Sequence, residues 1–394
     1  MKNIFSFLIV GFIVVIPVYG LAANYEDVTI TVLDAVQPPN LQEEEITITV
    51  LDAQEILPPN QEDVTITVVD APYLSLTPSD GSTFLAGSKL NIQAAASDFN
   101  HPPLEYQFSI GGSVTQPWSS LSTHTWQTSG ADTGVVEIIA EARDSQKETA
   151  AKTLTYRIIN PTTEEILQKV ADNYAKIYDF KADMTLSSTL NGKPFGETDY
   201  CRYYFKAPNK EKTESFTDAS RTNKAEAIII DGPTMHLVDY INKLTQQVDL
   251  LNETGITNQQ FNQMDLYYNQ VNFLNNHSLA KNVKESDLNN FIICLEAIPK
   301  EQNKLYSKLD LYIDYNKGLL LTSQLFKENE NKQAELVQTI EALETQQMPN
   351  GAWVLTQITK IPTLKSDLLI EIADYSNIQI NTGLTDSDFN PKEQ

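Results

Sequence analysis

Residues Pro161 to Ile177 read PTTEEILQKVADNYAKI, and the character of the chain changes at this stretch. Thr162 has the chemistry of a helix N-cap, and Glu165 follows three positions later, which is the spacing of a capping box. The apolar residues that follow recur at helical spacing and are Ile166, Leu167, Val170, Tyr174 and Ile177. The stretch therefore predicts an amphipathic helix that buries one face.

Downstream of Asp179 the apolar residues alternate with polar ones, which is typical of half-buried strands. Asn191 and Gly192 form a strong hairpin-turn signal, and a helical pattern over 259–275 interrupts the series. The expected strands lie at 182–190, 200–208, 227–232, 234–240, 291–297, 308–314, 319–327, 335–341, 353–361 and 367–380. A sheet of this size curls, and a helix across its open side would enclose an apolar cavity.

Upstream of this region, residues 73–159 predict a β-sandwich. Short alternating runs lie at 90–96, 104–110, 135–142 and 153–158, with turn residues between them. The stretches Gly87–Asp98, Pro103–Phe108 and Glu141–Asp144 resemble strands of bacterial immunoglobulin-like modules. The resemblance implies a module that positions or presents its neighbour.

Residues 23–72 contain a tandem repeat with a period of 18 residues, VTITVLD at 28–34, ITITVLD at 46–52 and VTITVVD at 64–70. Each copy alternates like a strand, but seven residues cannot bury an apolar face alone. Eleven acidic residues and no Lys or Arg lie between Glu26 and Asp70. Stacked strands, an extended spacer and strands lent to a partner's sheet all fit, and we favour the acidic spacer.

Residues 1–22 predict a signal peptide. Lys2 precedes the apolar run Ile4–Ile16, and the small residues Gly20 and Ala22 suit cleavage after Ala22. An uncleaved anchor is the alternative, since the apolar stretch is about long enough to span a bilayer. We expect an exported protein in the periplasm, with secretion or N-terminal membrane anchoring as less favoured locations.

Composition limits the partners and the chemistry. The chain has 52 acidic against 28 basic residues, a formal net charge of -24, which argues against nucleic acid as a partner. Cys201 and Cys294 are the two cysteines. In an oxidising compartment they form either one candidate disulfide or two buried free thiols, and the sequence leaves both open.

The sequence predicts no enzyme. It contains no nucleophile elbow, Walker loop, metalloprotease helix or Cys-x-x-Cys motif. The four histidines are scattered, and none has a second His or Cys at metal-ligand spacing. We therefore expect no catalytic residues, no metal and no cofactor.

The C-terminal region, 161–394, resembles the LolA/LolB/RseB-like family of periplasmic lipoprotein-binding proteins, within it the outer-membrane lipoprotein-sorting group. The resemblance covers about 230 residues, Pro161–Phe389, and depends on the order of several motifs. These motifs are the helix Glu165–Ile177, the strand end Tyr204–Lys210, and the segments Ile230–Asp239, Leu309–Asp314 and Ile378–Phe389.

The resemblance implies a half-open antiparallel β-barrel, covered by helices, whose apolar face receives acyl chains. Arg often precedes the proline that corresponds to Pro208 and ties down the helical lid, but here Ala207 stands there. Arg202 is the candidate substitute for lid tethering. The candidate cavity residues share one strand parity and are Met184, Leu186, Tyr203, Phe205, Ile228, Ile230, Leu237, Leu311 and Ile313.

The expected fold class is mainly β with an α+β C-terminal domain, an immunoglobulin-like sandwich followed by a LolA-like half-barrel. The resemblance implies a carrier of lipoprotein acyl chains or other lipids for transport and sorting toward the outer membrane. Inner- or outer-membrane transport proteins are the implied partners. The alternatives are an RseB-like envelope-stress sensor and an envelope or surface protein that binds through the immunoglobulin-like module.

Overall fold

The computed structural model describes residues 31–34, 67–70, 73–97, 101–249, 263–301, 306–362 and 369–391. The predicted signal peptide lies outside these residues. The described chain divides into two compact units, which interleave in sequence. The first unit comprises the described residues up to Asp80 together with Asn91–His124 and Glu137–Thr155, and the second comprises Gly81–Leu90, Thr125–Val136 and the described residues from Tyr156 onward. The domain borders expected from the sequence stay a prediction.

Two copies of the tandem repeat form a short parallel pair. Strand β1 (Thr31–Asp34) comes from the first copy and β2 (Thr67–Asp70) from the third, and equivalent positions lie opposite each other from Thr31 and Thr67 onward. The expected strand character is confirmed for these residues. The second copy lies outside the described residues, and the role of a spacer stays a prediction.

Residues 73–159 form two sheets, with strand orders β3-β5-β8 and β4-β10-β9-β6-β7. On β5, Leu90, Ile92 and Ala94 are buried and alternate with exposed residues, as expected for strands with one covered face. The elements are β3 (Tyr73–Thr77), β4 (Thr83–Leu85), β5 (Lys89–Ser97), β6 (Glu105–Ile110), β7 (Ser113–Ser119), β8 (Thr123–Gln127), η1 (Gly130–Asp132), β9 (Gly134–Arg143) and β10 (Thr149–Ile159). The four expected runs correspond to β5, β6, β9 and β10, while the immunoglobulin-like assignment stays a prediction.

Helix α1 (Thr163–Tyr174) begins at the predicted capping box. The backbone N–H of Glu165 donates to Thr162 Oγ1 at 3.2 Å, and the backbone N–H of Thr162 donates to Glu165 Oε2 at 2.7 Å. The helix buries Ile166, Leu167 and Val170, so the predicted apolar face is confirmed.

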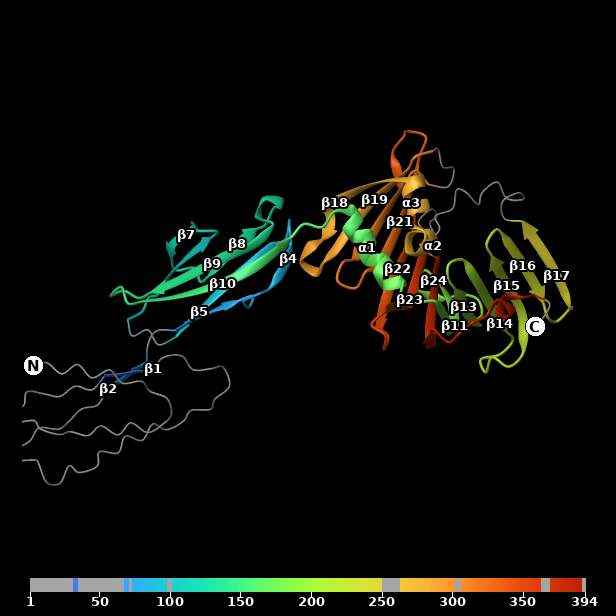
Figure 1. Cartoon of the computed structure of the whole chain (residues 1–394), viewed down its shortest axis with the longest axis horizontal. Helices are drawn as coiled ribbons and strands as arrows, with labels where there is room; N and C mark the ends of the chain where they lie inside the picture. Colours follow the sequence, from blue (N-terminus) through green and yellow to red (C-terminus); the bar gives the residue numbers. More distant parts are fainter. Residues whose placement is uncertain are drawn as a thin grey trace, which may run out of the picture. The chain divides into compact units, whose positions relative to one another are not determined.

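The second unit is built around a fourteen-stranded sheet, as counted over the described residues. Neighbouring strands are antiparallel, in the order β17-β16-β15-β14-β13-β11-β24-β23-β22-β21-β20-β19-β18, and β12 pairs with β11. Because the order ends at β17 and at β18, the sheet is open and is not a closed barrel (Figure 1). Its strands are β11 (Asp179–Leu190), β12 (Lys193–Pro194), β13 (Asp199–Lys206), β14 (Lys210–Phe216), β15 (Lys224–Asp231), β16 (Thr234–Asp239), β17 (Leu244–Asp249), β18 (His277–Asp287), β19 (Ile292–Pro299), β20 (Lys308–Asp314), β21 (Leu319–Glu328), β22 (Ala334–Gln347), β23 (Trp353–Pro362) and β24 (Leu369–Ile380).

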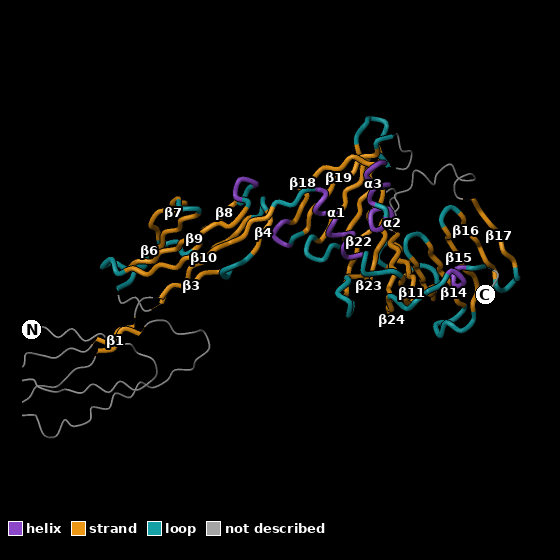
Figure 2. The backbone as a smooth tube through the Cα atoms, in the orientation of Figure 1, coloured by secondary structure: helices purple, strands orange, loops and turns teal. Residues whose placement is uncertain are grey.

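Two short helices stand where the sequence predicts one, namely α2 (Gln263–Tyr268) and α3 (Gln270–Asn276). Asn269 separates them because its backbone is not helical and its side chain caps α3 by accepting the N–H of Asn272 at 3.4 Å. Figure 2 shows the helices of this unit on its sheet of strands. Among the described helices, none has the length and apolar composition needed to cross a membrane.

The main hydrophobic core lies between these helices and strands β18 to β21. Ile166 and Val170 of α1 are fully buried against Leu295, Leu311 and Ile313 of the sheet. Each such side chain contributes roughly 1.5–3 kcal/mol when it leaves water. We call the sheet face that packs against α1 and α2 the inner face; it carries Phe180, Phe205, Leu311 and Ile313.

The outer face of β13 to β16 is covered by the chain end. Tyr204, Ala227, Ile229 and Val238 form a buried cluster with Phe389 of the 3-10 turn η3 (Asp386–Phe389). Another 3-10 turn, η2 (Leu288–Asn290), follows β18.

Candidate functional site

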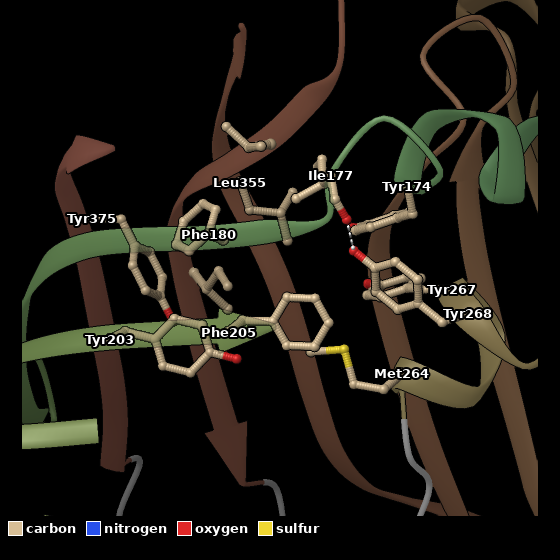
Figure 3. Close-up of a pocket in the computed structure, with 12 residues that line it drawn as sticks. Tyr174, Ile177, Phe180, Tyr203, Phe205, Met264, Tyr267, Tyr268, Leu355 and Tyr375 are labelled. Carbon is tan, nitrogen blue, oxygen red and sulfur yellow. Dashed lines mark hydrogen bonds between the residues drawn. The ribbon is translucent and has the colours of Figure 1, made fainter. Parts of the chain in front are cut away.

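A cavity of about 160 Å³ lies on the inner face, between the helices and the middle of the sheet (Figure 3). Aromatic and aliphatic side chains from α1, α2 and four strands surround it. They are Tyr174, Ile177, Phe180, Tyr203, Phe205, Met264, Tyr267, Tyr268, Val354, Leu355, Ile358 and Tyr375.

Three tyrosines form the helix side of the cavity. The ring of Tyr174, at the end of α1, stacks on Tyr267 with centroids 3.8 Å apart and meets Tyr268 edge-on at 5.8 Å. Tyr268 also donates a hydrogen bond from its hydroxyl to the carbonyl of Ile177 at 3.1 Å, as Figure 3 shows. Thus α2 holds the segment that leaves α1 by both ring contacts and a hydrogen bond.

The sheet side of the cavity is formed by rings from three adjacent strands. Phe180 on β11 lies opposite Phe205 on β13. Tyr203 meets Phe180 edge-on at 6.0 Å and Tyr375 of β24 edge-on at 6.2 Å. Residues two apart on a strand, or directly opposite on neighbouring strands, share a face, which explains how these rings converge.

The polar groups of the cavity are mostly phenols, which are neutral at pH 7, and burial raises their pKa further. Burial raises the pKa of Tyr267 to about 12, and burial with the nearby Glu211 carboxylate raises that of Tyr375 to about 12. Tyr203 donates a hydrogen bond to Glu211 Oε2 at 3.1 Å. Burial in turn raises the pKa of Glu211 above its ordinary value. The site is therefore apolar and aromatic, with one carboxyl group beside it.

Helix α1 is held over the sheet by Asn173, which is buried. Its Nδ2 donates to the carbonyl of Trp353 at 3.0 Å, and the backbone N–H of Trp353 donates to Asn173 Oδ1 at 2.7 Å. The turn between β20 and β21 also touches the helix closely, because a Cβ at Gly318 would lie 2.1 Å from the carbonyl oxygen of Lys169. These contacts fix the helix side of the cavity relative to β23 and β21.

Two of the nine predicted cavity residues, Tyr203 and Phe205, line the cavity. Leu311 and Ile313 are fully buried in the core beneath α1, where side chains fill the space. The others lie elsewhere on β11, β15 and β16, with Met184 buried, Leu186, Ile230 and Leu237 half-buried and Ile228 46% exposed. A ligand-binding role for all nine stays a prediction.

Arg202, the predicted lid tether, has its partner inside the sheet. Its Nε lies 2.9 Å from Asp183 Oδ1 on the neighbouring strand. Strand alternation places Arg202 on the opposite face from Tyr203. The polar contacts of α1 and of the segment that leaves it include those of Asn173, Gln270 and Tyr268. Cys201 and Cys294 are both buried free thiols, which corresponds to the second of the two alternatives.

The sequence reasoning missed ten of the lining residues. Phe180 could have been found, since it continues the parity of Met184 on the same strand. Tyr174 and Ile177 were predicted as part of the apolar face of the helix. They were not among the predicted cavity residues. Tyr267, Tyr268 and Tyr375 carried no sequence signal, because only the fold brings these distant segments together.

One group with metal-ligand chemistry lies in the first unit. Ligand atoms of His101, Asp144 and Glu148 lie within 4.8 Å of one another. Asp144 Oδ1 accepts the backbone N–H groups of Gln146 and Glu148, both at 2.9 Å, and Oδ2 faces His101 Nδ1 at 3.2 Å. Asp144 thus closes a turn with hydrogen bonds to its own segment.

No family model matches the sequence, and no curated protein matches it. Solved structures similar to this chain include a domain assigned to outer membrane lipoprotein sorting from Vibrio parahaemolyticus, with 15% identity over 59% of this chain and 98% of that one, at a TM-score of 0.42. A LolA superfamily protein from Nitrosomonas europaea has 16% identity, covers 58% of this chain and 98% of its own, and has a TM-score of 0.40.

A DUF1329 family protein from Desulfovibrio piger has 15% identity over 58% of this chain and 96% of its own, with a TM-score of 0.42. At these identities and TM-scores the similarity does not assign a function to this chain.

Proposed function

We propose that residues 161–394 act as a carrier that binds the acyl chains of lipoproteins or related lipids, in the periplasm, for sorting toward the outer membrane. Membrane transport proteins would be the partners that load or unload it. The observation that carries the proposal is the aromatic cavity between α1, α2 and the inner face. Apolar-ligand sites are concave, lined by aromatic and aliphatic side chains, and hold few polar groups.

The volume of the cavity sets how much of a ligand it can hold. A cavity of about 150 Å³ accepts a group the size of benzene, and this one measures about 160 Å³. Roughly six methylenes at about 0.8 kcal/mol each would contribute about 5 kcal/mol. Micromolar affinity requires about 8 kcal/mol, so a tightly bound chain must contact more apolar surface than the cavity provides.

The inner face offers that surface beyond the cavity. Tyr203 lies opposite Thr213, Thr213 opposite Ile228, and Ile228 opposite Leu237, so these side chains form one row across β13 to β16. Ile228 is 46% exposed. We call these four side chains the apolar row. In the proposal, one end of an acyl chain enters the cavity and the rest of the chain lies along the apolar row.

The proposal is tested with an uncharged lipid probe whose fluorescence rises in apolar surroundings. The full chain should bind it, and Ile358→Trp, which places a larger ring in the cavity, should weaken binding by about 10-fold, equivalent to about 1.4 kcal/mol. Leu343→Trp is the matched control because Leu343 is 51% exposed on β22 and away from the cavity lining.

Native mass spectrometry of the protein purified from a cell envelope gives a second measurement, and it should detect co-purifying lipid or acylated peptide. A protein that emerges without ligand and does not bind the probe would refute the carrier function. Equal probe binding by both tryptophan variants and the unaltered chain would refute the cavity as the site.

A further inference from the structure

Glu211 lies on the inner face, between the cavity and the exposed end of the sheet. On β14 it is opposite Phe205 of β13 on one side and opposite Ile230 of β15 on the other. Phe205 lines the cavity, and Ile230 lies two residues from Ile228 of the apolar row. A ligand that extends from the cavity along the inner face therefore passes this carboxyl group.

Glu211 has no cationic partner among the residues that the structure describes. Among the described residues, no Lys or Arg nitrogen lies within 4.0 Å of its carboxylate. The neighbouring lysines of β14 point to the outer face, where Lys210 is 3.0 Å from Asp231 and Lys212 is 3.3 Å from Glu214. Within the described part of the chain, the Glu211 carboxylate has the hydroxyl of Tyr203 as its hydrogen-bond partner.

The surroundings of Glu211 make a negative charge there unfavourable. They also leave one of its carboxyl oxygens able to accept a hydrogen bond. Burial raises its pKa, which is the expected response of a carboxylate among apolar groups without a cation. Tyr203 occupies Oε2 at 3.1 Å, so Oε1 can accept a hydrogen bond from a ligand. A second anion placed beside it would be repelled in poorly solvated surroundings.

We propose that Glu211, positioned by Tyr203, makes the site select amphiphiles whose polar end donates a hydrogen bond and carries no negative charge. Hydroxyl, amide and ammonium groups meet this requirement. Free fatty-acid carboxylates and other anionic head groups do not. The inference rests on the proposed function and specifies its ligand class: the chain would carry neutral or cationic acylated molecules and reject free fatty acids.

The experiment measures displacement of the uncharged probe by C12 compounds that differ in the polar end, at about pH 8, where carboxylic acids and amines are both ionised. Dodecanol supplies a hydroxyl, dodecanamide an amide N–H, dodecylamine a cation and dodecanoate an anion. Methyl dodecanoate has neither a hydrogen-bond donor nor a charge. It therefore separates the gain from a donated hydrogen bond from the loss caused by a negative charge. The alcohol and the amide distinguish a neutral lipid from an acylated peptide as the source of the donor.

For the unaltered chain, dodecanol, dodecanamide and dodecylamine should each displace the probe at concentrations about 10-fold lower than dodecanoate, since like charges in contact are strongly unfavourable. Methyl dodecanoate should fall between the two groups. Glu211→Gln should improve displacement by dodecanoate about 10-fold, weaken that by dodecylamine, and leave the ester unchanged.

Glu226→Gln is the matched control. Glu226 lies on β15 at the same parity as Ile228 but is exposed, so this variant changes the net charge equally without altering the polar group beside Phe205. For this variant, the five C12 compounds should displace the probe in the same order of effectiveness as for the unaltered chain.

Equal displacement by dodecanoate and dodecanol in the unaltered chain would overturn the inference, and this comparison needs no variant. Equal shifts for Glu211→Gln and Glu226→Gln would also overturn it, because the effect would then be one of net charge. If the probe does not bind at all, the proposed function itself fails, so the two failures are distinguishable.

Discussion

Glu211 has consequences for stability as well as for binding. Its pKa in the folded chain is raised by burial, above the value of about 4.3 expected in the unfolded chain. A carboxyl with a raised pKa contributes stability that is fully present below the unfolded value and is lost as the pH rises through the folded value. At neutral pH the Glu211 carboxyl group therefore destabilises the folded chain relative to acidic pH.

Replacing Glu211 by Gln should reverse this effect. The amide keeps an acceptor for Tyr203 and has no charge to bury. Glu211→Gln should therefore gain stability relative to the unaltered chain between about pH 4, where the carboxyl group is mostly protonated, and about pH 7. Urea unfolding at the two pH values measures the difference. A stability difference that does not change with pH would mean that the carboxylate is well solvated.

Gly318 is a position where only glycine fits for two separate reasons. Its φ is +63°, and an added Cβ would lie 2.1 Å from the carbonyl oxygen of Lys169 in α1. Gly192, in the hairpin turn after β11, has a φ of +77° but no heavy atom within 4 Å of such a Cβ. The two glycines share the backbone requirement and differ in the contact.

Gly192→Ala should lower the free energy of unfolding by about 1–2 kcal/mol, the cost of a left-handed backbone for alanine. Gly318→Ala should lower it by several kcal/mol more, because the turn and α1 must also move apart, and overpacking alone is worth about 1–3 kcal/mol. Chemical denaturation of both variants gives the comparison. Equal losses of unfolding free energy in the two variants would show that α1 can move away from this turn at little cost.

At the scale of elements, the position of α1 depends on few polar contacts. Asn173 is buried and joins α1 to Trp353 on β23 through two hydrogen bonds. Asp172, its neighbour in sequence, is exposed and accepts a hydrogen bond from Gln168 within the helix. Asn173 and Asp172 therefore allow a comparison of a buried side chain that hydrogen-bonds to another element with an exposed one that hydrogen-bonds within its own helix.

Asn173→Ala should lower the free energy of unfolding by about 2–6 kcal/mol, because it removes the Asn173 partner of two backbone groups of Trp353, at about 1–3 kcal/mol each. Asp172→Ala should change it by less than about 0.5 kcal/mol. Hydrogen exchange should also become faster in α1 for the first variant only. Unchanged exchange would show that the apolar contacts of Ile166 and Val170 suffice to hold the helix.

Strand β14 shows how the fold accommodates charge inside a sheet. Lys212 and Glu214 are both buried, and their side chains lie 3.3 Å apart on the outer face. Lys224 adds a second contact to Glu214 at 2.8 Å, and Tyr204 donates its hydroxyl to Glu214 at 3.0 Å. The contacts keep the pKa of Glu214 below its usual value despite burial.

For the whole molecule, the dominant electrostatic property is the formal net charge of -24. Self-repulsion of this kind destabilises a compact state, and salt reduces it. Between about 10 mM and 150 mM salt the screening length falls from about 30 Å to about 8 Å. Added salt should therefore stabilise the folded chain.

The midpoint of thermal unfolding, followed by circular dichroism, should rise by about 1–2 °C over this range if the relief amounts to about 1 kcal/mol. A second monovalent salt at equal ionic strength should give the same shift, since screening does not depend on the ion. A lower midpoint would contradict the prediction and would mean that ion pairs such as Lys360–Glu371 outweigh the net repulsion.

Local chemistry made part of the fold predictable. The capping box of Thr162 and Glu165 marked the start of α1, because both hydrogen bonds join residues three apart. The turn at Asn191 and Gly192 joins β11 and β12 as expected, since both residues adopt the positive φ angles that the turn requires. Most strands followed from alternation, which is a direct result of the two-residue period.

Other elements could not be predicted from the sequence. Strand β14 reads KEKTESF, and its charges conceal the buried positions until the neighbouring strands supply the partners of Lys212 and Glu214. Strands β17 and β18 are similarly polar. The expected single helix over 259–275 was wrong within its described part, because Asn269 caps a new helix in its middle.

By itself, the sequence determined a repeat and a largely antiparallel β-rich chain with one amphipathic helix, because these depend on interactions between near neighbours. Only the tertiary structure decided which apolar residues line the cavity, which fill the core beneath α1, and that Glu211 lies between Phe205 and Ile230. The physical reason is that alternation along a strand assigns each residue to one face of the sheet. The curvature of the sheet and the positions of the helices then decide which part of that face stays open.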